Sequence, residues 1–333
     1  MPGPIRVLID IHSANYDLWD FPEPLYQVFL EKFPSVMFHR CTSLEDFRAH
    51  LDAATVIFGR WLRPEELPLA TQLTWFHTSA AGVERQLYPA FVERGITLTS
   101  SAGARAGAIA EFIMGSLIAF NRQLPRIWSA QRERRWDATT SWVNYQRIPV
   151  LDGGRMVIAG LGGIGQETAR LAKAFGMEVW GTKRDITTEI PWVDRIAPPE
   201  ALAELLPGAD VVVDCLPSTP ATHQLFSAEL FALMESSTVF INVGRGATVD
   251  EMALTAALET QQIRGAILDV FTTEPLSVDS ALWTLDSCMV VPHVSNIVDQ
   301  FWEPTADLFY ENLRLFLLNL PLMNVVEQTG AGY

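Results

Sequence analysis

Cysteine, positive charge and long apolar runs are all scarce in this sequence. Its three cysteines lie far apart with no CxxC pair, which excludes a disulfide framework and a zinc knuckle and suits a reducing compartment. Lysine and arginine number 24 against 39 aspartates and glutamates, and the formal charge of −15 disfavours nucleic-acid and membrane-surface partners. No apolar run approaches the ~18 residues that span a bilayer, and the first residues lack a signal-peptide pattern. These absences predict a cytoplasmic globular protein, for which we predict no metal site.

The length and the composition are sufficient for two compact domains. The chain has 333 residues, against roughly 150 per domain, and 49% of them are hydrophobic. Short strand-like runs alternate with helix-like stretches, which predicts parallel sheets covered by helices. The predicted strands span residues 6–11, 36–39, 56–59, 73–78, 96–99, 156–159, 178–181, 211–216, 239–243, 266–270 and 289–291. Helices are predicted at 23–33, 44–51, 64–70, 108–128 and 305–318, and residues 137–147 are interpreted as a long functional or interface loop.

A glycine-rich turn lies between a predicted strand and a predicted helix. Residues 156–165 have the sequence MVIAGLGGIG, in which Gly160, Gly162 and Gly165 form the pattern G-x-G-x-x-G. The first glycine permits a tight turn, the second lets the backbone approach a pyrophosphate, and the third lets helix and strand pack closely. Apolar positions spaced four, three and four apart between residues 164 and 175 predict the helix, whose N-terminus offers unpaired N–H groups to phosphates. The segment therefore predicts a dinucleotide site.

The residues at the end of the next strand indicate which dinucleotide is bound. An acidic residue there binds the ribose 2′-hydroxyl of NAD, whereas cationic residues accommodate the 2′-phosphate of NADP. The strand runs into Thr182, Lys183 and Arg184, and Asp185 follows. The two cations therefore favour NADP, and NAD remains the alternative if the register places Asp185 at the ribose.

An arginine, a glutamate and a histidine follow three successive predicted strands. They are Arg245, Glu274 and His293. Ligands of open α/β sheets bind beyond the carboxyl ends of the strands, so we expect these side chains around one crevice. A guanidinium can stabilise the alkoxide charge that develops when hydride adds to a ketone, and histidine can supply a proton near neutrality. Thr248 and Glu251 are predicted to form a capping box for the next helix.

Several segments resemble the D-isomer-specific 2-hydroxyacid dehydrogenase family. In chain order they are SAAGVE at 79–84, AEF at 110–112, GLGGIG at 160–165, LPSTPATH at 216–223, INVGRGATVDEMAL at 241–254, GAILDVFTTEPL at 265–276 and VPHVS at 291–295. Spaced motifs in the right order are more specific than any one of them. The resemblance implies an oxidoreductase that transfers hydride between NAD(P)H and C2 of a small 2-oxo acid of the glyoxylate or hydroxypyruvate type, giving a D-2-hydroxy acid.

The resemblance also implies roles for individual residues. Arg245 would bind the carboxylate of the 2-oxo acid and polarise its carbonyl, His293 would exchange the proton, and Glu274 would hold His293 cationic. Backbone N–H groups near Ala81 and Gly82 would bind the substrate carboxylate. The cofactor contacts would be Gly160, Gly162, Gly163, Ile164, Gly165, Thr182, Lys183, Arg184, Leu216, Pro217, Thr222, Val243, Gly244, Asp269 and Ser295.

The fold that the resemblance implies is a pair of doubly wound parallel-sheet domains with a cleft between them. Residues 1–101 and 299–333 would form a flavodoxin-like substrate domain, because the family builds this domain from both chain ends. Residues 102–298 would form a Rossmann cofactor domain, through which a homodimer is expected. Three tryptophans that flank or lie within the predicted loop are expected to make core or dimer contacts: Trp128, Trp136 and Trp142.

Other side chains bear on the substrate and on rival functions. Arg60 and Trp61 follow a strand of the first domain and are predicted to contact the tail of the substrate. His12 and His77 also lie near strand ends, without an arginine or a paired acid at comparable positions. Phosphite oxidation would use a similar Arg–Glu–His set, and a dinucleotide-sensing corepressor would use the same fold. A formate dehydrogenase is disfavoured, because that branch usually replaces the glutamate found at Glu274 with glutamine.

Overall fold

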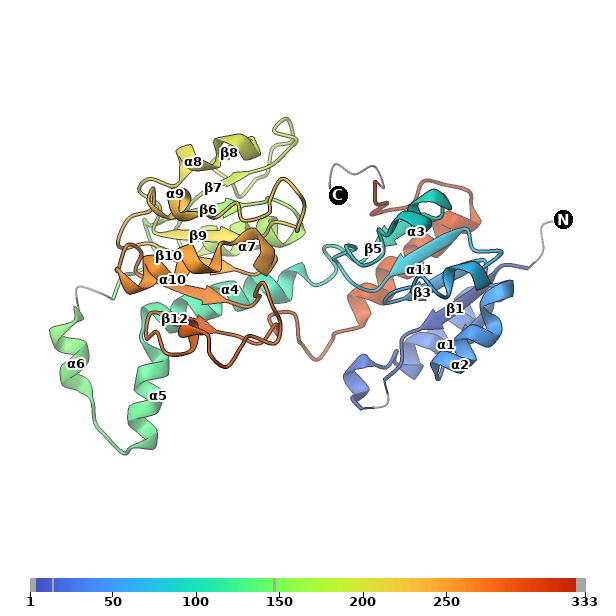
Figure 1. Ribbon diagram of the computed structural model, residues 1–333, viewed down its shortest axis with the longest axis horizontal. Coiled ribbons are helices and arrows are strands. Elements are labelled where there is room, and N and C mark those ends of the chain that lie inside the picture. The colour runs from blue at the N-terminus through green and yellow to red at the C-terminus, as the bar shows by residue number, and fades with distance from the viewer. Residues whose placement is uncertain (1–3, 14, 146–147, 328–333) are drawn as a thin grey trace. The chain divides into compact units, whose positions relative to one another are not determined.

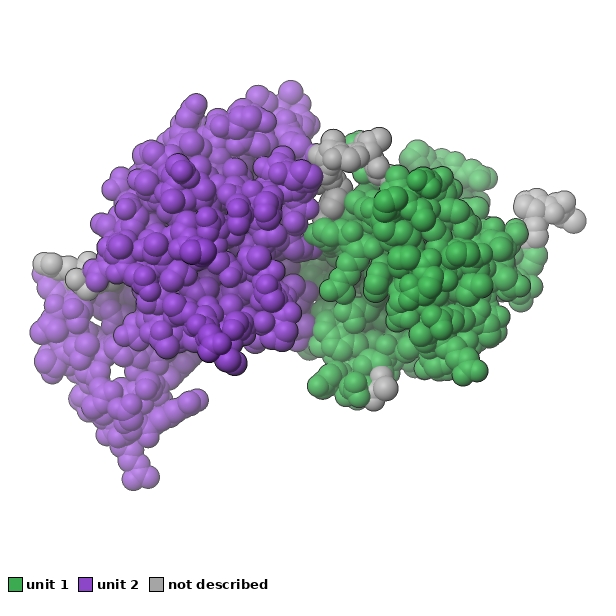
Figure 2. Space-filling view, viewed as in Figure 1, with its two compact units in different colours: residues 1–105, 298–333 green, residues 106–297 purple. Residues whose placement is uncertain are grey.

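The computed structural model describes residues 4–13, 15–145 and 148–327, and it divides the chain into two compact units. Unit 1 comprises residues 1–105 and 298–333, and unit 2 comprises residues 106–297 (Figure 2). The boundaries drawn from the sequence differ from these by four residues at the first junction (101 against 105) and by one at the second (299 against 298). All three cysteines are free. Among the described helices, none is long and apolar enough to cross a membrane.

Unit 1 contains a five-stranded parallel sheet in the order β2-β1-β3-β4-β5 (Figure 1). This is the strand order of flavodoxin-like doubly wound sheets, so the fold class predicted for this part of the chain is confirmed. The strands are β1 (Arg6–Asp10), β2 (Met37–Arg40), β3 (Val56–Gly59), β4 (Trp75–Thr78) and β5 (Thr97–Ser100). The helices are α1 (Glu23–Lys32), α2 (Leu44–His50), α3 (Pro89–Glu93) and α11 (Glu303–Leu317), with short 3-10 turns η1 (Asp17–Trp19), η2 (Leu51–Ala53) and η3 (Leu67–Leu69).

Alternating side chains of the unit 1 strands enter two separate cores, because successive residues of a strand point to opposite faces. Ile9 of β1 packs in a core with α1 and α11, whereas its neighbour Leu8 packs in a core with α2. Phe309 of α11 stacks on Phe58 of β3 with ring centroids 4.3 Å apart. Beyond α11, the N–H of Val326 donates to the carbonyl of Leu98 at 2.9 Å. Both ends of the chain therefore build this unit.

Unit 2 contains a seven-stranded parallel sheet in the order β12-β11-β10-β9-β6-β7-β8. The strand order reverses between β6 and β9, as it does in a Rossmann domain, and such a switch point is where dinucleotides bind. The strands are β6 (Arg155–Ala159), β7 (Glu178–Thr182), β8 (Arg195–Ala197), β9 (Val211–Asp214), β10 (Val239–Asn242), β11 (Gly265–Leu268) and β12 (Cys288–Val290). The helices are α4 (Ala106–Asn121), α5 (Leu124–Arg132), α6 (Ala138–Val143), α7 (Gly163–Ala174), α8 (Leu202–Leu205), α9 (Ala228–Phe231) and α10 (Glu251–Glu259), with 3-10 turns η5 (Pro199–Ala201), η6 (Gly246–Thr248) and η7 (Ala281–Trp283).

The structure corrects several predicted elements. The helix predicted at 108–128 is two helices, because Gln123 has a left-handed φ of 55° and Pro125 in the first turn of α5 has no N–H to continue α4. Residues 138–143 of the predicted loop form α6, and residues 146–147 lie outside the described residues. The predicted helix at 64–70 is only the turn η3, and α3, α8, α9 and β8 were not predicted. In Figure 1, α5 and α6 project from the rest of unit 2.

Candidate active site

The glycine-rich turn connects β6 to α7 in the way that a dinucleotide requires. A Cβ on Gly165 would lie 2.2 Å from the carbonyl oxygen of Gly160, so only glycine permits this helix to approach the strand. At Gly162, the N-cap of α7, a Cβ would meet no atom within 4 Å, which leaves the backbone open at the helix N-terminus. Thr182 at the end of β7 fixes the position of the turn, because its Oγ1 accepts a hydrogen bond from the N–H of Gly160 at 3.2 Å. These residues fit a pyrophosphate at the N-terminus of α7.

Three of the four positions on the predicted apolar face of α7 face the core, because Thr168 is buried and Ile164 and Leu171 pack against the buried cluster. The buried residues of the helix are Gly165, Thr168, Ala169 and Ala172, whereas Phe175 follows the helix and is 44% exposed.

The end of β7 presents cations rather than a free acid. Lys183 is half-buried and Arg184 is exposed. The carboxylate of Asp185 accepts hydrogen bonds from the N–H and the hydroxyl of Thr187, at 3.0 and 2.6 Å, and from the hydroxyl of Thr188 at 3.0 Å. These bonds hold the pKa of Asp185 below its usual value, and they engage this acid within its own loop.

The other predicted cofactor residues of this region follow β9 and β10. Leu216 and Pro217 come just after β9, and Thr222 closes this loop by donating from its hydroxyl to the carbonyl of Pro217 at 2.7 Å. Val243 and Gly244 follow β10 and are buried. Both segments therefore lie beyond the carboxyl ends of neighbouring strands, next to the switch point.

The predicted histidine and glutamate meet at the ends of adjacent strands. Nδ1 of His293, after β12, lies 2.8 Å from Oε2 of Glu274, after β11. The second carboxylate oxygen of Glu274 accepts the N–H of Phe271 at 3.0 Å, which fixes its orientation. His293 has a left-handed φ of 55°, a conformation that is uncommon outside glycine and is found at functional sites. The two side chains are 47% and 36% exposed, so a ligand can reach them.

The segment of the predicted arginine packs directly against the segment of the glutamate. Arg245 follows β10, is half-buried, and donates from Nη1 to the carbonyl of Gly244 at 2.7 Å. A Cβ on Gly246 would lie 1.9 Å from the carbonyl carbon of Phe271, so the backbones of the two segments are in contact. The structure therefore gathers the segments of Arg245, Glu274 and His293 beyond the ends of three neighbouring strands.

The predicted capping box at Thr248 is wrong. The N-cap of α10 is Asp250, whose side chain accepts the N–H groups of Met252 and Ala253. The hydroxyl of Thr248 instead contacts the carboxylate of Asp214 and the carbonyl of Arg245. Thr248 therefore ties the arginine segment to the end of β9 rather than starting the helix.

Asp269 holds the segment that follows His293. Its buried carboxylate accepts the N–H groups of Val294 and Ser295 at 2.8 and 3.1 Å, and the hydroxyl of Ser295 at 2.5 Å. Asp269 and Ser295, both predicted to contact the cofactor, are thus hydrogen-bonded to each other, and Asp269 positions the backbone beside His293.

Asp214 is expected to make the stability of unit 2 depend on pH. Burial raises the pKa of Asp214 to about 7, against the opposing hydrogen bonds from Thr248 and the N–H of Leu216. A carboxyl group whose pKa is raised by folding stabilises the fold fully below its unfolded value of about 3.9, and this contribution is lost as the pH rises through the folded value. Asp214→Asn is therefore expected to be relatively less stable than wild type at pH 5 than at pH 8, as measured by urea unfolding. Equal stability differences at both pH values would contradict this assignment.

The predicted substrate residues Ala81, Gly82, Arg60 and Trp61 lie in unit 1. Among the hydrogen bonds of the described residues, none is donated by the N–H of Ala81 or Gly82, so both are available to an anion. Trp61 is held by its own unit, since its Nε1 donates to the carbonyl of Arg85 at 2.8 Å.

The two other strand-end histidines differ from each other. His77 is buried between the hydroxyls of Thr99 and Ser101, and burial lowers the pKa of His77 to about 3, so it is a neutral core residue. His12 lies 3.2 Å from the carboxylate of Asp10. The expectation that no acid accompanies His12 was therefore wrong, and the i, i+2 spacing of the two residues was a signal for the pair.

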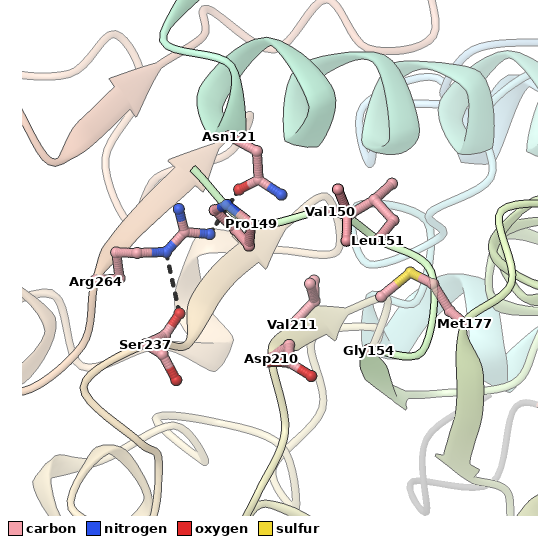
Figure 3. A pocket seen from close by; sticks show the side chains of 10 residues that line it. All are labelled: Asn121, Pro149, Val150, Leu151, Gly154, Met177, Asp210, Val211, Ser237 and Arg264. Carbon is pink, nitrogen blue, oxygen red and sulfur yellow. Dashed lines mark hydrogen bonds between the residues drawn. The ribbon is translucent and has the colours of Figure 1, made fainter. Parts of the chain in front are cut away.

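A small cavity of about 100 Å³ in unit 2 is not the cofactor site. Gly154 and Asp210 in its lining precede β6 and β9, so it lies at the amino ends of the strands (Figure 3). Arg264 in this lining donates to the carbonyl of Ser237 at 3.0 Å and to Oδ1 of Asn121 at 2.6 Å. In Figure 3 the guanidinium of Arg264 is thus bonded to two of the other lining residues.

Comparison with known proteins identifies the family. Residues 114–295 match the model of the "D-isomer specific 2-hydroxyacid dehydrogenase, NAD binding domain". This match covers more than half of the chain. The chain belongs to the D-isomer specific 2-hydroxyacid dehydrogenase family.

Relatives in this family are named dehydrogenases and reductases. A D-3-phosphoglycerate dehydrogenase of Methanocaldococcus jannaschii is 30% identical over 83% of this chain, which spans only 51% of that relative's length. A glyoxylate reductase of Thermofilum pendens is 30% identical to this chain, and the match covers 79% of this chain and 77% of the length of that reductase.

Solved structures of the same family share the whole fold. A family protein from Aeromonas salmonicida has a TM-score of 0.83 at 29% identity, covering 98% of this chain and 100% of its own. A member from Xanthobacter autotrophicus, in complex with NADPH and MES, has a TM-score of 0.81 at 26% identity, covering 98% and 99%. A Rossmann unit and a flavodoxin-like unit are therefore the architecture of this dehydrogenase family member.

Proposed function

We propose that this protein is an NADPH-preferring reductase of small 2-oxo acids, of the glyoxylate or hydroxypyruvate kind, that produces D-2-hydroxy acids. The observation that carries the proposal is the hydrogen bond between His293 and Glu274 at the ends of adjacent strands. The segment of Arg245 packs against the segment of Glu274, since Gly246 contacts the backbone of Phe271. When bound, the nicotinamide supplies the hydride that C2 of the substrate receives. A glyoxylate reductase among the relatives supports this substrate class.

The three side chains divide the remaining chemistry. The Arg245 guanidinium binds the carboxylate of the 2-oxo acid and stabilises the negative charge that develops on its carbonyl oxygen. His293 protonates that oxygen, and because Nδ1 is engaged with Glu274, Nε2 is the ring nitrogen that carries the proton. Glu274 accepts a hydrogen bond from Nδ1 and fixes the plane of the ring.

The cofactor is held by unit 2 through the β6–α7 turn and the end of β7. The open backbone at Gly162 accommodates the pyrophosphate, and Lys183 and Arg184 would bind the 2′-phosphate of NADPH. The NADPH in the Xanthobacter structure supports this preference.

The direct test of the proposed reaction follows reduced-nicotinamide absorbance across a panel of 2-oxo acids, with NADPH and NADH side by side. We expect turnover of glyoxylate or hydroxypyruvate and a higher kcat/KM for NADPH. Tight NADPH binding without turnover of any 2-oxo acid would contradict catalysis and favour a dinucleotide-sensing role.

Glu274→Gln is expected to move the pH profile of reduction downward. A neutral amide stabilises positive charge on a neighbouring ring less than a carboxylate does. The measurement is kcat/KM for hydroxypyruvate against pH at saturating NADPH. Glu229→Gln removes a similar charge from an exposed position in unit 2 and serves as the control. A Glu274→Gln profile that stays with that of wild type would show that the pair is not coupled.

We also propose a homodimer formed through unit 2. The segment that projects from this unit in Figure 1 carries Trp136 and Trp142, which are 95% and 70% exposed in the single chain. Exposed aromatic side chains of this size are typical of an interface. Light scattering is expected to give twice the 37.1-kDa mass of the chain, and Trp136→Ser with Trp142→Ser is expected to shift it toward the monomer.

A further inference from the structure

Three side chains of the kinds that bind metal ions converge where β2 passes into α2 in unit 1. They are His39 and Cys41, from the end of the strand, and Asp46, from the first turn of the helix. A ring nitrogen, the thiol sulfur and a carboxylate oxygen of these residues all lie within 4.8 Å of one another. Ligand atoms around a tetrahedral zinc ion are roughly 3.3–3.8 Å apart, given bonds of about 2.0–2.3 Å. Small side-chain adjustments would therefore close this cluster around one ion.

The periodicities of the strand and the helix bring the three residues together. His39 and Cys41 are two residues apart, so both side chains point to the same face of the sheet. The N–H of Cys41 donates to the carbonyl of Ile9 at 2.9 Å, so the extended pairing continues through this residue. Ser43 then starts α2, because its hydroxyl accepts the N–H of Asp46 at 3.1 Å. The carboxylate of Asp46 is directed back to the strand, where its Oδ1 lies 2.8 Å from Nε2 of His39.

The thiol of Cys41 is buried without a polar partner. The residue is 1% exposed, and among the described residues its sulfur takes part in no hydrogen bond and no disulfide. A cysteine that only fills space behaves as a small apolar side chain and needs no polar neighbours. Here the sulfur instead lies within 4.8 Å of an imidazole nitrogen and a carboxylate oxygen. The buried thiol therefore points into a set of three different ligand atoms.

The other two side chains give the cluster access to solvent. Those of His39 and Asp46 are 37% and 21% exposed. Thr42 fixes the carboxylate, since its N–H and its hydroxyl donate to Oδ2 of Asp46 at 2.9 and 3.3 Å. The imidazole of His50 stacks on that of His39 with ring centroids 3.8 Å apart, and its Nδ1 lies 2.9 Å from the carbonyl oxygen and 3.2 Å from Oδ1 of Asp46. It lies beside the three ligand atoms and is not one of them.

We propose that His39, Cys41 and Asp46 bind a zinc ion in unit 1. Thiolate sulfur, imidazole nitrogen and carboxylate oxygen are the ligands that Zn²⁺ takes in proteins, and three protein ligands leave the fourth position to a water molecule. The sulfur disfavours Mg²⁺ and Ca²⁺, which take oxygen ligands. As the bond between zinc and sulfur forms, the thiol proton is released to solvent.

The zinc site goes beyond the proposed function, because it lies within unit 1 and uses none of the residues assigned to the reaction. It revises the prediction of no metal site, which rested on the absence of a CxxC pair. Its ligands come instead from three different residue types within eight positions of the chain.

Cobalt substitution tests the sulfur ligand. Co²⁺ occupies zinc sites, and a bond to thiolate gives it a near-ultraviolet charge-transfer band. We expect metal-free full-length protein to bind one Co²⁺ per chain with this band, and Zn²⁺ to remove the band by displacing cobalt. Cys41→Ser is expected to lack the band, whereas Cys288→Ser, which removes a free thiol from unit 2, is expected to keep it. Absence of the band in wild type, or a band that persists in Cys41→Ser, would overturn the site.

His39→Ala tests the site at a partly exposed position, without changing the buried thiol. A competition titration against a chromophoric chelator measures zinc affinity, and far-ultraviolet circular dichroism checks the fold. Loss of the imidazole is expected to weaken zinc binding by at least ~10²-fold, since even outer partners of ligands contribute about 10–100-fold. His223→Ala removes an exposed histidine from unit 2 and is the control.

Thermal unfolding provides a second readout, because an ion that binds only the folded chain stabilises it. Zn²⁺ is expected to raise the unfolding temperature of wild type and of His223→Ala, and to raise that of His39→Ala less. Equal zinc affinity in the two histidine variants would overturn the site. Because neither measurement involves turnover, that result would leave the proposed function intact, and absence of 2-oxo acid reduction would leave the zinc site intact.

Discussion

His293→Ala is expected to lower kcat for 2-oxo acid reduction by at least ~10²-fold, the range that a general acid contributes. In the proposed reaction the imidazole is the proton donor; its Nδ1 lies 2.8 Å from Oε2 of Glu274, and alanine leaves no group in its place. NADPH affinity is expected to stay within a few-fold of wild type, because the predicted phosphate contacts lie on the β6–α7 turn and at the end of β7. Stopped-flow measurement of hydride transfer and fluorescence titration of NADPH separate these two effects.

His50→Ala is the control for this substitution. His50 ends α2 in unit 1, is exposed, and bonds to the carbonyl of Asp46. It is expected to leave kcat unchanged. Activity retained in His293→Ala would remove this histidine from the mechanism, and loss of NADPH affinity in step with kcat would indicate a structural defect.

Lys183→Asp combined with Arg184→Ser is expected to weaken NADPH binding by at least ~10²-fold and NADH binding far less. A hydrogen bond to a charged group contributes about 1.5–3 kcal/mol, and two such contacts to the 2′-phosphate correspond to that factor or more. The introduced carboxylate would also repel the phosphate, and it could accept the 2′-hydroxyl of NADH. Isothermal titration with both cofactors measures the difference.

The matched control removes a cation elsewhere on unit 2. Arg170→Ser on α7 breaks an exposed pair with Glu167 and is expected to change neither affinity by more than about twofold, as surface ion pairs contribute little. Equal weakening of NADPH and NADH in the double variant would show that the two cations do not contact the 2′-phosphate.

Local patterns predicted most of the fold because the strands are short, apolar and separated by clear turn residues. The run from Val56 to Gly59 matches β3 residue for residue, and the glycine pattern placed the start of α7. Because ligands of open α/β sheets bind beyond the strand ends, Glu274 and His293 could be predicted to lie close together. The boundaries that failed depend on single residues, such as the left-handed Gln123 that splits the helix and Asp250, which caps α10 in place of Thr248.

The contact between Arg105 and the ring of Phe301 in unit 1 could not be predicted from the sequence. Arg105 stands in a stretch of small residues without a strand-end pattern, and Phe301, the ring beneath it, lies almost two hundred residues further along the chain. Such a contact has no local signature, because only the tertiary fold brings the two segments together. The pairing of Asp10 with His12 was available in the i, i+2 spacing and was missed.

The way in which the chain builds its two units sets an order of assembly on the ribosome. Unit 2 is one uninterrupted stretch, whereas unit 1 needs α11, whose Phe309 stacks on Phe58. Synthesis from the N-terminus therefore completes every strand of unit 2 while unit 1 still lacks a layer of its core. In nascent chains that end before Glu303, residues 106–297 should therefore resist a protease, whereas residues 1–105 should remain digestible.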